Sequence, residues 1–119
     1  MATADMWAWR DQSWAGLDLV GFGVEATDGG IGKVDEATHD VGGAYIVVDT
    51  GPWIFGKKVL LPAGIVQTVD IDEGKVFVNR TKDEIKNAPE FDEATYKDQA
   101  YRSNLGGYYS SPTRERTRL

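Results

Sequence analysis

The feature that most constrains the fold is a run of short strand-like segments between residues 20 and 81, separated by glycine-rich turns. Residues 20–26 alternate apolar side chains with small or polar ones, which is the pattern of a strand with one buried face. Gly29 and Gly30 follow, and glycine takes the positive φ angles of a tight turn without steric cost. Residues 31–37 then continue as a second strand. Short strands at this spacing favour a small barrel or sandwich over parallel α/β units.

The segment with the strongest signal for a central strand is residues 44–48. It is apolar throughout, which predicts a strand buried on both faces. Pro62 ends the strand that follows, because proline has no N–H to donate to a ladder. The remaining strands are expected at residues 57–61, 65–71 and 75–78, the last two joined as a hairpin by the turn at residues 72–74.

Helices are predicted after the strands. Thr81 and Glu84 have the spacing of a capping box, in which each side chain binds the other residue's backbone N–H. Pro89 should end this short helix. A second helix is expected to begin near Asp92 and to stop at Gly106 and the glycine after it.

The chain divides by composition into three parts. Residues 1–17 form an N-terminal flank, residues 18–92 the strand-rich domain, and residues 93–119 a C-terminal helix with a polar tail. The flank carries Trp7 and Trp9, with Trp14 close behind. Tryptophans this dense are expected to pack on the domain or on a partner.

Several glycine, apolar and acidic positions resemble those of the PRC-barrel family. The resemblance covers roughly residues 18–92. It rests on three features. The first is a G-x-x-V-x-x-x-D-G-x-I-G-x-V pattern, formed here by Gly21, Val24, Asp28, Gly29, Ile31, Gly32 and Val34. The other two are a V-L-L-P strand end at residues 59–62 and a capped helix that ends in Ala-Pro at residues 88–89. It implies a mainly β fold, namely a small antiparallel PRC-type β-barrel with C-terminal helices and a short N-terminal flank.

The family's known roles are contacts with other macromolecules and support of a neighbouring electron-transfer centre. Its members include the cytoplasmic domain of the photosynthetic reaction-centre H subunit and the C-terminal domain of a ribosome maturation factor. The resemblance brings no shared catalytic residues. This chain shows neither the membrane helix of the first nor the preceding domain of the second, so neither specific role is expected to transfer.

Charge and cysteine content narrow the expected partners and location. The formal net charge of −6 disfavours nucleic acid and anionic membrane surfaces, which both require clustered positive charge. No apolar run is long enough to insert into a membrane, and the N-terminus has no signal-peptide pattern. The absence of cysteine is typical of a reducing compartment, so a cytoplasmic location is expected. The alternating arginines at positions 114, 116 and 118 are interpreted as a solubilising tail.

No group of residues has the pattern of a catalytic, cofactor or metal site. Residues 21–26 fit the G-x-G-x-x-A form of a dinucleotide fingerprint, but they lie in a predicted strand rather than before a helix. Asp70, Asp72 and Glu73 lack the spacing and flanking helices of a calcium loop. His39 is the only histidine and lies in a turn. We therefore expect that the protein is not an enzyme and that it holds no cofactor and no metal ion.

The loop between residues 50 and 58 carries three large apolar residues, Trp53, Ile54 and Phe55, between glycines. They either plug one end of the barrel or form an exposed interface, since aromatic residues among polar ones anchor many interfaces. The expected function is a non-enzymatic interaction or scaffold module that self-associates or binds a protein partner. The alternative is a barrel that binds a small ligand or cofactor, although barrels this small fill their interior with side chains.

Overall fold

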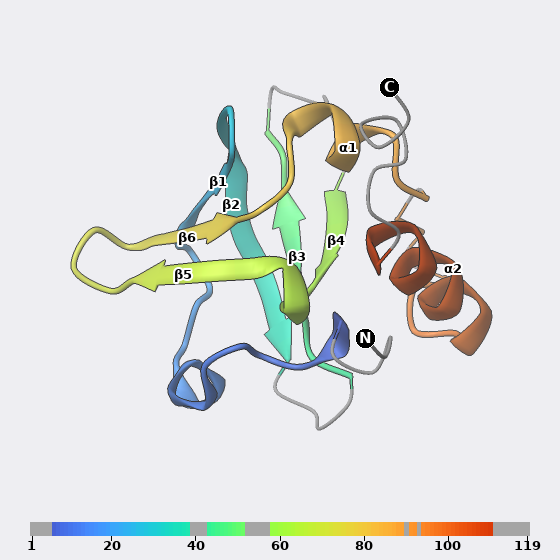
Figure 1. Ribbon diagram of the computed structural model, residues 1–119, viewed down its shortest axis with the longest axis horizontal. Helices are drawn as coiled ribbons and strands as arrows, with labels where there is room; N and C mark the ends of the chain where they lie inside the picture. The colour runs from blue at the N-terminus through green and yellow to red at the C-terminus, as the bar shows by residue number, and fades with distance from the viewer. Residues whose placement is uncertain (1–5, 39–42, 52–57, 90, 93, 111–119) are drawn as a thin grey trace.

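The computed structural model describes residues 6–38, 43–51, 58–89, 91–92 and 94–110 (Figure 1). Its main element is one sheet of six strands, followed by two helices. The strands are β1 (Gly23–Ala26), β2 (Gly29–Thr38), β3 (Tyr45–Asp49), β4 (Lys58–Pro62), β5 (Val66–Asp70) and β6 (Lys75–Val78). The helices are α1 (Lys82–Lys86) and α2 (Gln99–Ser110), with short 3-10 turns η2 (Gln12–Gly16) and η3 (Ala63–Ile65).

The sheet is mixed rather than wholly antiparallel. Its strand order is β4-β3-β2-β1-β6-β5, and every neighbouring pair is antiparallel except β1 and β6, which are parallel. The two outermost strands, β4 and β5, follow each other in the chain and are joined by η3, so the sheet curls. In Figure 1, β5 and β6 run across the direction of β3 and β4. The mainly β prediction is confirmed, but within the described residues β4 and β5 do not pair to close the barrel.

The strand positions agree with the sequence pattern almost throughout. Residues 45–48 are buried at every position, which confirms that β3 is a central strand. The exception is the start of the first strand, because β1 begins at Gly23 and not at Val20. Gly21 has a φ of 93°, which breaks the extended backbone, and Val20 before it is 56% exposed.

The capping box predicted for α1 is present. The Thr81 N–H donates to Oε1 of Glu84 at 2.9 Å, and the Glu84 N–H donates to Oγ1 of Thr81 at 3.1 Å. These two bonds satisfy donors that the first turn of a helix leaves without partners.

The predicted bounds of the second helix are wrong at both ends. α2 begins at Gln99 rather than near Asp92, and it continues through both glycines to Ser110. The reason is packing, since a Cβ on Gly106 would lie 2.8 Å from Nε1 of Trp7. The glycine lets the helix approach the Trp7 ring closely and does not end the helix.

The N-terminal flank packs on the domain, as its tryptophans predicted. Trp7 and Trp9 are buried in the same core as the strands, and Trp14 packs half-buried against it. The Ala44 N–H donates to the Trp7 carbonyl at 3.0 Å, and Nε of Arg10 donates to the Gly64 carbonyl at 2.9 Å. The described part of the flank is therefore continuous with the strand-rich domain.

Candidate interaction surface

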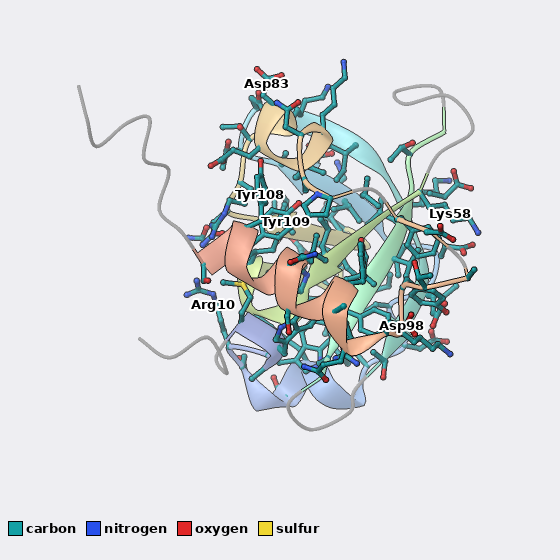
Figure 2. The ribbon with its side chains drawn as sticks, turned by 90° about the vertical axis from the view of Figure 1, so that its right-hand side faces the viewer. Arg10, Lys58, Asp83, Asp98, Tyr108 and Tyr109 are labelled. Carbon is teal, nitrogen blue, oxygen red and sulfur yellow. The ribbon has the colours of Figure 1, made fainter. Side chains whose placement is uncertain are left out.

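The outer face of β2 and β3 is covered by segments from both ends of the described chain. The Tyr45 ring meets the Tyr96 ring edge to face, with centroids 6.2 Å apart. The Arg102 guanidinium lies 4.8 Å from the Trp7 ring and 5.7 Å from the Tyr45 ring. Figure 2 shows α2 lying across the sheet at this face. We call β2, β3 and β4 with these segments the covered side.

A carboxylate holds two tyrosines within the covered side. Glu36 on β2 accepts hydrogen bonds from the hydroxyls of Tyr96 at 3.1 Å and Tyr45 at 3.4 Å. Desolvation first, and then the charge of Glu36, raise the pKa of Tyr45 to about 12. Tyr96 is 60 residues from Glu36 in the sequence, so no local pattern could predict this cluster. With both hydroxyls bound, Glu36 acts as an anchor for the C-terminal segment.

The far end of α2 is also anchored to the domain. The Arg80 guanidinium donates to the carbonyl oxygen of Tyr109, one of the carbonyls that a helix end leaves without an intrahelical partner. The Tyr108 hydroxyl donates to the Glu84 carbonyl at 2.6 Å. Burial raises the pKa of the Tyr109 phenol, whose ring packs edge to face on Tyr108. Both ends of α2 are thus fixed against the domain (Figure 2).

The strands β1, β6 and β5 form a second side that neither helix covers (Figure 1). We call it the open side. Along β6, Val76 and Val78 point into the core while Lys75 and Phe77 face outward. Phe77 lies between Glu25 on β1 and Thr68 on β5. Nζ of Lys75 lies 3.6 Å from the carboxylate of Glu25, a solvent-exposed ion pair of small energetic weight.

The exposed large hydrophobic residues of the described chain lie within or next to the strands of the open side. They are Val20, Ile71 and Phe77, which are 56%, 60% and 37% exposed. Val20 precedes β1, Ile71 lies in the turn between β5 and β6, and Phe77 lies within β6. The Gly23 N–H donates to the Gly74 carbonyl at 2.9 Å, which holds that turn against the start of β1.

The turn between β5 and β6 is acidic. The Asp70 carboxylate accepts the N–H of Glu73 at 3.0 Å, so it supports the turn itself. Asp72 and Glu73 are exposed. Within the described part of the chain, no three histidine, aspartate or glutamate side chains gather closely enough to hold a metal ion. The turn is the hairpin that the sequence predicted.

The predicted interface residues Trp53, Ile54 and Phe55 lie outside the described residues, and so does His39. Their roles stay predictions. The exposed positions that the sequence analysis missed are Phe77, Ile71 and Val20. The signal for Phe77 was available, because the middle residue of Val-Phe-Val in a half-buried strand faces away from the core. Residues 23–26 form strand β1 and are followed by a hairpin turn, as predicted. A dinucleotide site would require a helix at this point.

Comparison with known proteins agrees with this fold. Residues 17–85 match the model of the PRC-barrel domain, and this match covers more than half of the chain. The chain belongs to the PRC-barrel family. A relative in Deinococcus radiodurans, described only as an uncharacterized protein, is 41% identical over 61 residues, or 51% of this chain. The matched region is 20% of that relative's length, so the chain corresponds to a small part of it.

The helices of the described chain are too short and too polar to cross a bilayer.

Proposed function

We propose that this PRC-barrel domain is a non-enzymatic protein-interaction module and that its contact surface is the open side. The observation that carries the proposal is the unequal covering of the sheet. The chain's own segments bury the outer face of β3, whereas Phe77 and Ile71 remain exposed on the open side. Exposed apolar side chains beside charged ones, such as Phe77 next to Glu25, occur at many interaction sites.

The buried core gives less support to the alternative, a barrel that binds a small ligand. Ligand sites combine an apolar cavity with a few convergent polar groups. Most of the described core is formed by packed apolar side chains such as Ile46 and Leu61, and its few polar groups include Thr50 and the hydroxyl of Tyr109. A core of this composition offers little with which to orient a polar ligand.

The proposal is tested by removing the apolar groups of the open side and measuring which proteins remain bound. We expect Phe77→Ser combined with Ile71→Ser to abolish retention of the partner by tagged protein, whether the partner is a second copy or another protein. The control is Lys97→Ser, a change at an exposed position on the covered side. Melting curves should show all variants folded, because both hydrophobic side chains are already solvent-accessible.

Two outcomes would overturn the proposal. One is that retention is unchanged in the double variant. The other is that wild-type protein neither self-associates nor retains any protein. A thermal-shift screen against metabolites and metal ions addresses the alternative, since a stoichiometric ligand that binds only the folded state raises the melting temperature.

A further inference from the structure

We propose that the edge of β5 pairs in antiparallel fashion with β5 of a second copy of this chain, forming a two-fold symmetric dimer. This inference rests on the proposed function and names a partner for the open side. In the sheet of the described residues, β5 has β6 as its hydrogen-bonded neighbour on one edge, and the other edge is the end of the strand order. An unpaired edge presents backbone N–H and C=O groups that can accept another strand.

Of the two edge strands, β5 is the more accessible. The last three residues of β4 are buried, and its Pro62 has no N–H to donate. In β5, by contrast, Gln67 and Thr68 are exposed. A register shift between Val66 and Thr68 leaves Gln67 out of the register with β6, so the first part of β5 carries a bulge.

Charge decides both the direction of pairing and the nature of the partner. The end of β5 runs into the acidic turn with exposed Asp72, whereas its beginning follows Gly64, whose carbonyl binds exposed Arg10. In an antiparallel pair, the end of each strand lies beside the beginning of the other. With the two-fold axis at Thr68, Asp72 of each copy lies opposite Gly64 of the other and so close to the Arg10 bound there, and the symmetry creates this contact twice.

Parallel pairing would instead place the two acidic turns side by side, where like charges repel. The antiparallel arrangement also brings exposed Ile71 of one copy against the start of β5 in the other. The same contact therefore covers an apolar residue and pairs opposite charges. A second copy supplies both complementary ends without any further partner.

The first experiment measures dimerisation by sedimentation over a concentration series for Asp72→Lys and Arg10→Glu. Each variant alone places like charges in both contacts, so we expect its dimer dissociation constant to rise at least ~10-fold. In a mixture of the two variants, one contact joins the introduced glutamate to the introduced lysine, and the other joins native Asp72 to native Arg10. The mixture should therefore form heterodimers with a dissociation constant close to that of the wild-type dimer.

The matched control is Asp83→Lys, which makes the same charge change at an exposed position on α1 and should leave dimerisation unchanged (Figure 2).

A second measurement does not depend on Arg10, which also binds Gly64. The chain has no cysteine, so Thr68→Cys introduces a single thiol near the two-fold axis. It should form a disulfide-linked dimer on mild oxidation, whereas Asp83→Cys should not, because a disulfide requires Cα atoms within about 7 Å.

The inference is overturned if dimerisation is unaffected by both charge variants, if the mixture fails to recover it, or if Thr68→Cys does not cross-link. It is also overturned if wild-type protein stays monomeric while it binds another protein through Phe77. In that last case the proposed function stands. If wild-type protein is monomeric and binds nothing, both fail.

Discussion

β3 and β6 belong to the same sheet and have similar apolar content, yet their outer faces differ. Tyr45 on β3 is 4% exposed because the C-terminal segment and Trp7 lie over it. Phe77 on β6 is 37% exposed because no described segment of the chain reaches it. A strand's sequence fixes which side chains point outward, but only the rest of the chain determines whether they meet protein or solvent. The covered side is therefore expected to behave as a cooperative part of the fold.

The largest expected effect is the loss of core packing under α2. Leu105 is fully buried, so Leu105→Ala should lower the free energy of unfolding by ~2–5 kcal/mol. Chemical denaturation with a two-state fit measures this change. On the open side, Val20→Ala is the control and should change stability little, since that side chain is 56% exposed. Equal losses in the two variants would contradict the comparison between the sides.

A smaller effect with opposite signs is expected at the two adjacent glycines of α2. Alanine favours a helix interior over glycine by about 1 kcal/mol, so Gly107→Ala should stabilise the protein, because a Cβ there meets nothing within 4 Å. Gly106→Ala should destabilise it, because the Cβ would lie 2.8 Å from Nε1 of the buried Trp7 ring. Thermal unfolding of both variants compares the signs. A gain in stability for Gly106→Ala would show that the helix does not press on Trp7.

The smallest effect is a loss of stability at alkaline pH that originates on the covered side. The pKa values of Tyr45 and Tyr101 are raised from 10.0 to about 12, chiefly by desolvation. Because the folded state favours the protonated phenols, their contribution is complete below pH 10 and is lost as the pH rises from 10 toward 12. Unfolding measured along this range should show a shallower decline for Tyr45→Phe. An unchanged profile would contradict the burial of that hydroxyl beside Glu36. The strands of the open side contain no tyrosine.

Much of the fold could be predicted because its signals are local. Alternation marks β6, continuous apolar character marks β3, and the Thr81–Glu84 spacing marks the start of α1. Each depends on residues within one turn or one strand, where backbone geometry alone relates sequence to structure. The pairing of Gly106 with Trp7 has no such local signal, and the helix was therefore predicted to end too early.

Part of the candidate surface depends on contacts between distant segments, which no local pattern shows. The sequence indicated an interaction module and pointed to residues 53–55, which lie outside the described residues and stay a prediction. Phe77 could have been assigned to the outer face by alternation, but its exposure depends on where α2 packs, and α2 lies more than 20 residues away in the chain.

The sequence by itself determined the strands, the hairpin between β5 and β6, the capped helix α1 and membership of the PRC-barrel family. The tertiary structure decided that β1 and β6 pair in parallel, that α2 runs through Gly106, and that one side of the sheet is covered while the other is open. The first group depends on backbone preferences within a few residues of each other. The second depends on contacts between distant segments, where packing and burial outweigh local propensity.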